Sequence, residues 1–395
     1  MKSNARAWKI MGRGLAAVAA FSVAAALAQT QGVSQDEIVI GTLQDLSGPL
    51  AGYGKDLRNG MMMRVAEANG KGIHGRKIRL LVEDTGYDPR KAVLAAQKLV
   101  NQDRIFVMAG SLGTAVNNAA LPVQTGKNVT NFFPAALSRD MYEPTHPLKY
   151  AFISSYYDQI KPATVRLYRE RKASRPCIVY QDDEYGLEIL RGAEAGLKDI
   201  DTEFAEKTSY KRGATDFSSQ VAKMKAANCD FVVMGTLIRE SVGVISEARK
   251  LGFSPVMLGA FGAYTDLIPK LGGKSMDGFY STMTVQHPYE EDAPAQIKPW
   301  LERYRAQFKD APSNYAIFGY VIMDRLVQSM EKAGAQLTTE SLAKAVQSLK
   351  TPVDVFGSPA MEIGPGRHLA SDKSRLSQIQ NGRWKVVIDY DAMSR

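Results

Sequence analysis

The sequence is poor in cysteine. Among its 395 residues there are two Cys, Cys177 and Cys229, and both lie in the middle third of the chain. A fold stabilised by a disulfide framework is therefore excluded. Each Cys lies at the start of an expected buried strand, so two interpretations stay open. Either they form one disulfide between neighbouring strands, or they are separate buried thiols that act as small apolar side chains.

Recognisable catalytic motifs are also lacking. No G-x-G-x-x-G follows a strand and no G-x-S-x-G elbow is present, which argues against dinucleotide binding and against an α/β-hydrolase. The run Gly272-Gly273-Lys274-Ser275 resembles the end of a phosphate-binding loop, but Ile268 stands where the first Gly of that loop belongs. The histidines are isolated and have no metal-ligand spacing; they are His74, His146, His287 and His368. We therefore expect neither an enzyme nor a metal or cofactor.

Long hydrophobic runs are absent outside the N-terminal segment. The apolar run 15–27 follows a basic segment and is shorter than the roughly 20 residues that a membrane-spanning helix needs. It ends in Ala26-Leu27-Ala28, a small-x-small cleavage pattern. We expect residues 1–28 to be a signal peptide cleaved after Ala28, with the mature protein in the periplasm. No Cys lies near this point, so we do not expect a lipoprotein anchor.

A block of charge of one sign is missing as well. The formal charge of +9 includes four basic residues that precede the apolar run, namely Lys2, Arg6, Lys9 and Arg13. The rest of the chain carries 46 basic and 41 acidic residues, a net charge of +5. These charges are mixed along the sequence, without the basic and aromatic cluster of a nucleic-acid groove. We expect no nucleic-acid partner.

The sequence does contain a repeated alternation of short apolar runs and amphipathic helices. Hydrophobic residues make up 45% of the chain, enough for one very large domain or two ordinary ones. The alternation predicts an α/β fold with parallel sheets covered by helices on both faces. A first series has strands at 37–43, 78–82, 105–109 and 129–133 and helices at 56–69, 89–102 and 114–124.

The pattern restarts after a less regular stretch at 134–155. The second series has strands at 177–180, 204–208 and 231–235 and helices at 158–171, 185–198, 217–227 and 239–251. Further helices are expected at 293–308, 315–332 and 338–349, and short strands at 361–363, 375–380 and 384–388. The tail is expected to form either separate short strands or a hairpin around Asn381-Gly382.

Several local sequences carry a family resemblance in combination. They lie near the start of the mature chain and in the second series of strands: Ser47-Gly48-Pro49, Gly54, Asn59-Gly60, Asn69-Gly70-Lys71-Gly72-Ile73, Asp84, Asp88-Pro89, Asp182-Asp183-Glu184-Tyr185-Gly186 and Thr215-Asp216-Phe217. Together they resemble periplasmic solute-binding proteins of the leucine/isoleucine/valine-binding type, which serve ABC importers of the branched-chain amino acid type. The resemblance covers nearly the whole mature chain.

The resemblance implies a type I periplasmic binding fold. In that fold two Rossmann-like lobes are joined by three hinge crossings and close over a ligand. The implied lobe 1 comprises residues 36–152 and 283–352, and lobe 2 comprises residues 153–282 and 353–395. The implied partners are a small-molecule ligand and the membrane permease and ATPase subunits of an ABC importer, and the protein is expected to be a monomer.

The resemblance also implies ligand contacts. The expected positions are Tyr53, Gly113, Thr114, Ala135, Ala136, Ser138, Tyr185, Leu237 and Phe261. Thr114 opens a helix, where its hydroxyl and free N–H groups would hold a carboxylate; an ordinary N-cap role is the alternative. Leu137 stands where family members often have a hydroxyl, so Ser138 is the substitute candidate. Tyr53 would cover the ligand from lobe 1, and Tyr185 would close onto it from lobe 2.

Phe261 is a departure from the family pattern. Amino-acid binders of this family have an acidic residue there for the ligand's ammonium group, and a buried ammonium without a partner is costly. Leu237 is likewise apolar. We therefore expect an organic acid with a hydrophobic or aromatic body. In the alternative, an amino-acid binder, one of four other acids would replace the missing one: Asp182, Asp183, Glu240 or Asp266.

Two further classes stay open: a ligand-sensing module for a membrane receptor, and an exported enzyme with a cryptic site. Turnover of candidate ligands would indicate the enzyme. Neighbouring permease and ATPase genes would favour transport over sensing.

Overall fold

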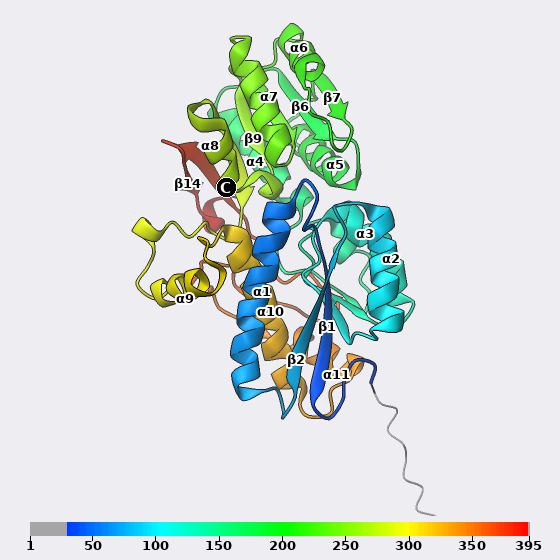
Figure 1. Ribbon diagram of the computed structural model, residues 1–395. Coiled ribbons are helices and arrows are strands. Elements are labelled where there is room, and N and C mark those ends of the chain that lie inside the picture. Colours follow the sequence, from blue (N-terminus) through cyan, green and yellow to red (C-terminus); the bar gives the residue numbers. More distant parts are fainter. Residues whose placement is uncertain (1–29, 394–395) are drawn as a thin grey trace, which may run out of the picture.

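A five-stranded parallel sheet forms the first half of the molecule. The computed structural model describes residues 30–393 (Figure 1), so the expected signal peptide lies outside the described residues. The strand order is β2-β1-β3-β4-β5. The strands are β1 (Glu37–Gln44), β2 (Lys77–Asp84), β3 (Val107–Ala109), β4 (Thr130–Phe132) and β5 (Lys149–Tyr150). All residues of β1 except the first are buried, as in a strand covered on both faces.

A seven-stranded sheet forms the second half, with the order β14-β13-β10-β9-β8-β6-β7. The strands are β6 (Pro176–Gln181), β7 (Glu206–Tyr210), β8 (Phe231–Gly235), β9 (Val256–Gly259), β10 (Tyr280–Met283), β13 (Arg375–Gln380) and β14 (Arg383–Ile388). The first five of these run parallel, whereas β13 pairs antiparallel with β10 and with β14. The turn between β13 and β14 contains Asn381 and Gly382, which confirms the expected hairpin.

Helices cover both sheets. The helices beside the first sheet are α1 (Ala51–Lys71), α2 (Pro89–Gln97), α3 (Thr114–Thr125), α9 (Lys298–Phe308), α10 (Asn314–Ala333) and α11 (Thr339–Gln347). In Figure 1, α1 with α10 and α2 with α3 lie on opposite sides of β1 and β2. The helices beside the second sheet are α4 (Tyr156–Glu170), α5 (Glu184–Lys198), α6 (Ser218–Ala226), α7 (Ile238–Lys250) and α8 (Leu267–Gly272). No helix within residues 30–393 is long and apolar enough to cross a membrane.

The chain passes between the two sheets three times: after β5, after β10 and after α11. We call each sheet with its helices a lobe, lobe 1 for the five-stranded sheet and lobe 2 for the seven-stranded one. A small ladder of β11 (Lys350–Thr351) and β12 (Met361–Glu362) precedes the last crossing, and Ala151 forms a bridge with Leu369 beside it. The expected lobe limits at residues 152, 282 and 352 stay a prediction.

Close packing of α1 on α10 depends on two glycines. A Cβ atom at Gly60 would lie 1.9 Å from the carbonyl oxygen of Ala316, and one at Gly319 would lie 2.1 Å from that of Leu57. Only glycine permits such an approach of two helix backbones. This packing fixes the first turns of α10, which carry Tyr315 and Phe318, beside the N-terminal half of α1.

Most expected elements are present, with shifts of a few residues at their ends. The strand at 231–235 has the expected limits, but the helix expected from 293 begins at Lys298, after the 3₁₀ turn η5 (Glu290–Asp292) and Pro294. Strands β5, β9 and β10 and helix α8 were not expected. Each of them has at most six residues, too few for a periodic pattern to be recognised.

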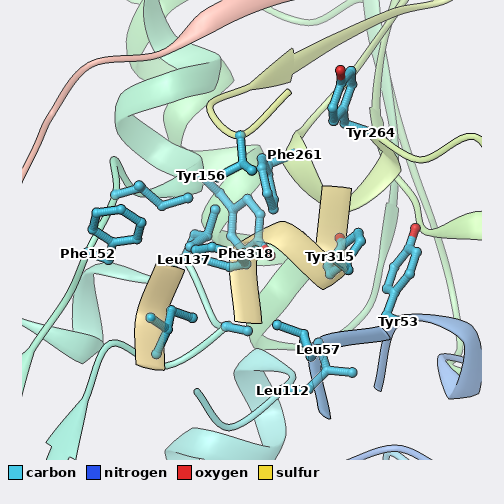
Figure 2. Close-up of a cluster of buried hydrophobic side chains, with 14 of the residues drawn as sticks. Tyr53, Leu57, Leu112, Leu137, Phe152, Tyr156, Phe261, Tyr264, Tyr315 and Phe318 are labelled. Atoms are coloured by element: carbon cyan, nitrogen blue, oxygen red, sulfur yellow. The ribbon is translucent and has the colours of Figure 1, made fainter. Parts of the chain in front are cut away.

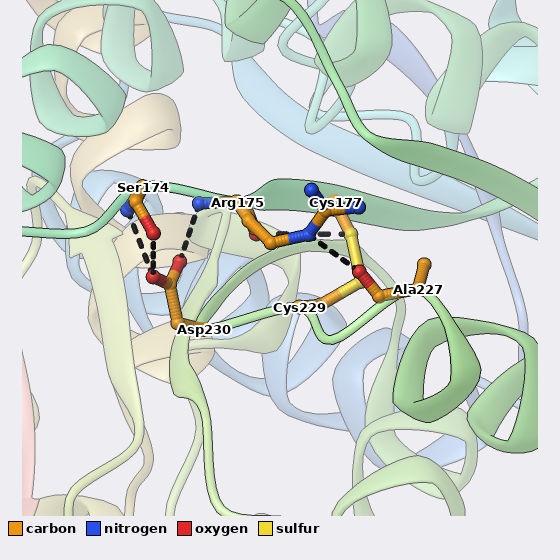
Figure 3. The surroundings of a disulfide bond; sticks show 6 residues. All are labelled: Ser174, Arg175, Cys177, Ala227, Cys229 and Asp230. Carbon is orange, nitrogen blue, oxygen red and sulfur yellow. Dashed lines mark hydrogen bonds between the residues drawn. A yellow bond between two sulfur atoms is a disulfide. The ribbon is translucent and has the colours of Figure 1, made fainter.

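Cys177 and Cys229 form a disulfide (Figure 3), which decides between the two interpretations left open by the sequence. Cys177 lies in β6, and Cys229 lies two residues before β8, which pairs directly with β6. The Cα atoms are 5.9 Å apart. The neighbouring Asp230 accepts hydrogen bonds from the backbone N–H groups of Ser174 (2.8 Å) and Arg175 (2.9 Å), which holds the same two segments together.

We predict that this disulfide stabilises lobe 2 without contributing to the site described below. The bond closes a loop with a sequence separation of 52 residues, so the double variant Cys177→Ala/Cys229→Ala should lose about 2–4 kcal/mol of unfolding free energy. Because the bond lies at the amino ends of β6 and β8, ligand affinity should not change. Urea unfolding and calorimetry measure the two quantities. An unchanged unfolding midpoint, or a large loss of affinity, would contradict this assignment.

Candidate ligand-binding site

A narrow cavity lies between the two lobes. Its volume is about 20 Å³, room for about one water molecule. The loops that line it follow the carboxyl ends of parallel strands, the usual position of ligand sites in open α/β sheets. The lining residues are Leu50, Tyr53, Tyr87, Leu112, Gly113, Thr114, Ala135, Leu137, Tyr156, Tyr185, Leu237, Phe261, Gly262, Tyr315 and Phe318.

Thr114 is the first residue of α3 and lies in the lobe 1 wall. Gly113 is the N-cap residue, and no side chain caps this helix, so the N-cap alternative for Thr114 is wrong. The Thr114 side chain is 1% exposed, and its hydroxyl has no hydrogen-bond partner within residues 30–393. The first N–H groups of an α-helix also have no acceptor in their own helix. This corner of the cavity therefore offers several free donors to an anion.

Tyr53 joins the two lobes. Its hydroxyl donates to the carbonyl oxygen of Gly262 in lobe 2, with an O···O distance of 2.8 Å. Its ring stacks on Tyr315, with ring centroids 3.9 Å apart and an angle of 11° between the rings. Burial raises the pKa of both phenols well above the usual value of 10.0, so both stay protonated.

The lobe 2 wall is mostly apolar. Tyr185 donates its hydroxyl to the carbonyl oxygen of Thr236 at 2.9 Å, and its ring makes an edge contact with Tyr156 at 5.0 Å between centroids. Leu237 lies beside it, because a Cβ atom at Gly262 would meet both the Tyr185 ring and the Leu237 side chain within 3.1 Å. The Tyr185 hydroxyl proton is thus already engaged with a backbone carbonyl oxygen, although the residue lines the cavity.

Phe261 fills the centre of the aromatic cluster (Figure 2). It is 2% exposed, and its ring lies 5.7 Å from Phe318 and 5.9 Å from Tyr315, between centroids. Phe261 belongs to the short turn η3 (Phe261–Ala263) after β9, whereas Tyr315 and Phe318 belong to α10 of lobe 1. An aromatic ring packed across the interface of the lobes therefore occupies the position where the resemblance implies an acid in amino-acid binders.

No acidic side chain lines the cavity in the described part of the chain. Of the four alternative acids, Asp182 pairs with Lys211, and Asp183 caps α5 and pairs with Arg212 at 2.6 Å. Asp266 pairs with Lys270 at 2.5 Å. Glu240 is buried 3.7 Å from Arg239, and burial raises the pKa of its carboxyl group.

Side chains around the cavity hold the lobes together. Arg139 of lobe 1 donates to Glu188 of lobe 2 at 2.9 Å, and Asn314 donates to the carbonyl oxygen of Tyr264 at 3.0 Å. Together with the Tyr53 contact, these bonds describe a closed arrangement. A ligand larger than water enters only if the lobes separate or side chains move.

The structure brings together seven of the nine expected site residues: Tyr53, Gly113, Thr114, Ala135, Tyr185, Leu237 and Phe261. Ala136 and Ser138 do not line the cavity. Ala136 packs in a separate apolar cluster with Met141 and Tyr142, and the Ser138 hydroxyl accepts from the N–H of Asp140. Leu137 occupies the cavity wall instead, which leaves the expected second hydroxyl of lobe 1 without a substitute at Ser138.

Sequence reasoning missed Leu50, Tyr87, Leu112, Tyr156, Gly262, Tyr315 and Phe318 as lining residues. Tyr87 follows the expected strand at 78–82, so its position after that strand was an available signal. Tyr156 follows the unexpected strand β5 and directly succeeds the irregular stretch 134–155, which offered no such signal. Tyr315 and Phe318 carried none, because they reach the cavity only through the packing of α10 on α1.

Comparisons with known proteins agree with this architecture. A family model described as "Periplasmic binding protein" matches residues 37–383. The Leu/Ile/Val-binding protein of Escherichia coli K12 is 25% identical over 331 residues, which cover 83% of this chain and 89% of the relative.

Two solved structures have the same fold. The possible leucine/isoleucine/valine-binding protein from Rhodopirellula baltica SH 1 has a TM-score of 0.81 and 19% identity, over 92% of this chain and 99% of the other. The fatty acid ABC transporter substrate-binding protein from Thermomonospora curvata has a TM-score of 0.83 and 22% identity, over 93% and 95% of the two chains. The chain thus belongs to the periplasmic binding protein family, with the two-lobed α/β fold of type I periplasmic binding proteins.

Proposed function

We propose that the chain is the extracytoplasmic solute-binding component of an ABC importer of the branched-chain amino acid type, and that its ligand is a small carboxylate with a hydrophobic or aromatic body. The observation that carries the ligand class concerns the described residues: there the Thr114 hydroxyl has no hydrogen-bond partner, and no acidic side chain lines the aromatic cavity around it. Residues 1–28 would direct export, and a permease with its ATPase would receive the ligand.

The lobe 1 corner supplies the anion site. A carboxylate there accepts from the Thr114 hydroxyl and from the N–H groups that open α3, and the positive end of the helix dipole adds to these bonds. An uncharged ligand would leave the buried donors with weaker partners. This corner accordingly favours an acid.

The rest of the cavity favours an apolar body. Phe261, Phe318 and Leu237 present no polar atoms, and an ammonium group beside them would lose its hydration without a compensating charge. An alkyl chain or an aromatic ring gains about 25 cal/mol per Å² of apolar surface buried. The Thermomonospora curvata protein, described as a fatty acid binder, shares this fold.

Amino-acid binding is the second candidate, because the Escherichia coli relative is a Leu/Ile/Val-binding protein. Calorimetry with benzoate, phenylacetate, hexanoate and octanoate, against leucine, isoleucine and valine, separates the two. Micromolar binding of an acid with no heat from the amino acids supports the proposal. Tight leucine binding without acid binding would overturn the ligand class, and binding of neither group would overturn both candidates. If a permease and an ATPase are encoded beside this chain, uptake of the ligand by membrane vesicles that contain them would distinguish transport from sensing.

We predict that Thr114 supplies affinity for the carboxylate. A hydrogen bond to a charged group contributes roughly 1.5–3 kcal/mol, so Thr114→Val should weaken acid binding about ten- to a hundredfold, while Thr114→Ser should retain most of it. The hydroxyl has no partner within residues 30–393, so Thr114→Val should not lower the melting temperature. Calorimetry and thermal unfolding give the two readouts. Equal acid affinity of the Val variant and the native protein would remove Thr114 from the site.

We predict that Phe261 sets the ligand class. Phe261→Glu places a second negative charge at the apolar end of the ligand, so acid binding should fall below detection and weak leucine binding should arise. Phe261→Leu keeps the site apolar and serves as the matched control, with acid affinity within about tenfold of native. Titration of both variants with the same acids and with leucine checks this. Unchanged acid binding by a folded Phe261→Glu variant would show that the ring does not face the ligand.

We predict a monomer that compacts on binding. The cavity of about 20 Å³ cannot admit an organic acid unless the lobes separate, so the free protein should populate an open arrangement and the complex a closed one. Small-angle scattering should show the mass of one chain and a smaller radius of gyration with saturating acid. An unchanged radius with bound ligand would contradict domain closure.

A further inference from the structure

Tyr87, in the loop between β2 and α2, has an unusual backbone conformation. Its φ angle is 59°, in the left-handed region, and the preceding Gly86 has a φ of 56°. A bulky aromatic residue seldom adopts this conformation, which costs free energy and persists only where surrounding contacts hold it. The contacts of Tyr87 come from both lobes.

In lobe 1, the Tyr87 ring packs closely against Gly113. A Cβ atom at position 113 would lie 2.6 Å from Cε2 of this ring, so a side chain there would displace the ring. Gly113 directly precedes Thr114, and both line the cavity together with Tyr87. The ring is therefore held beside the helix N-terminus that we propose as the carboxylate site.

From lobe 2, Arg212 and Gln181 hold the same residue. Arg212 donates to the carbonyl oxygen of Tyr87 at 3.3 Å, and its guanidinium carbon lies 4.8 Å from the ring centroid. The Nε2 atom of Gln181 donates to the Tyr87 hydroxyl oxygen at 3.4 Å. Asp183 fixes both partners, because it accepts from Arg212 and from Gln181 Nε2, at 2.6 Å each.

These contacts set the polarity of the Tyr87 hydroxyl. The bond to Asp183 orients the Gln181 amide with its NH₂ group toward the carboxylate, so this group is also what faces Tyr87. The hydroxyl oxygen accepts, and its own proton has no acceptor within residues 30–393. Burial raises the pKa of this phenol, so the proton stays in place at neutral pH. Tyr87 thus has one free donor.

We propose that Tyr87 donates this hydrogen bond to the ligand's carboxylate and is the residue that selects an acid over the corresponding amide. The inference rests on the proposed function, since it takes the carboxylate at the start of α3 as given. A carboxylate presents acceptors only and satisfies Tyr87, Thr114 and the helix N–H groups at once. A primary amide turns its NH₂ group toward at least one of these donors, and a site of buried polar groups left unpaired rejects such a ligand strongly.

The proposed hydrogen bond from Tyr87 to the carboxylate also links ligand binding to closure of the two lobes. The hydroxyl that would contact the carboxylate also accepts from Gln181 of lobe 2, so an acid in the site strengthens a contact between the lobes. An amide whose NH₂ group faces the Tyr87 hydroxyl would not strengthen this contact.

The test compares Tyr87→Phe with the native protein and with Tyr150→Phe. Tyr150 is the matched control because it also accepts a hydrogen bond from a glutamine, Gln347 Nε2 at 3.0 Å, but does not line the cavity. Calorimetry uses whichever of benzoate, phenylacetate, hexanoate and octanoate binds the native protein most tightly, and the amide of that acid.

We expect Tyr87→Phe to weaken acid binding about ten- to a hundredfold and to leave amide binding unchanged, so that the acid-to-amide ratio falls by the same factor. Tyr150→Phe should keep the native ratio. A folded Tyr87→Phe variant with the native ratio overturns the inference alone, as does an equal loss of acid and amide affinity. If the native protein binds none of the four acids, the proposed function fails and the inference fails with it.

Discussion

Parallel strands place the loops that follow them at one edge of a sheet, and here two such edges face each other. Thr114 reaches the cavity from the carboxyl end of β3, and Phe261 reaches it from the carboxyl end of β9. Every other feature of the site depends on this juxtaposition, because neither edge alone excludes water. Contacts between the lobes, such as that of the Tyr53 hydroxyl with the Gly262 carbonyl oxygen, bury the space between them, and polar contacts in such a low-dielectric space are stronger than in water.

Closure of the lobes also decides which hydrogen-bond donors and which acidic side chains face the cavity. Its polar groups include free donors, the hydroxyls of Thr114 and Tyr87, and its remaining wall consists mainly of aromatic and aliphatic side chains. The nearby carboxylates are engaged outside the cavity, as Asp183 is by Arg212. A site with free donors at one corner, and with no acidic side chain among the described residues of its wall, is complementary to an amphipathic anion. The family model establishes the family. Under our proposal, the aromatic ring of Phe261 gives this chain another ligand class than that of the relatives described as Leu/Ile/Val-binding proteins.

The contacts that make each lobe rigid differ from those that hold the two lobes together. Gly60 and Gly319 allow the close packing of α1 on α10 within lobe 1. The disulfide joins β6 to the segment just before β8 within lobe 2. Apart from the packing of Phe261 on Tyr315 and Phe318, the side-chain contacts between the lobes described above are mainly polar, such as Arg139 with Glu188 and Gln181 with Tyr87. Polar contacts exchange readily for water when the lobes part, whereas the packed interior of each lobe resists deformation.

Hydrophobic periodicity alone determined the α/β class and most helices. The pattern of an amphipathic helix such as α7, or of a buried strand such as β8, depends only on residues that are close together in the sequence. Local motifs that match the family likewise predicted Thr114, Tyr185 and Phe261 as site positions, and all three line the cavity. Only the tertiary structure placed Tyr315 and Phe318 in the cavity, removed Ser138 from it, and paired Cys177 with Cys229. It alone also showed that Tyr87 meets Gly113 and Gln181, residues 26 and 94 positions away in the sequence. Such contacts arise from the packing of whole lobes, and the spacing of residues along one segment carries no information about them.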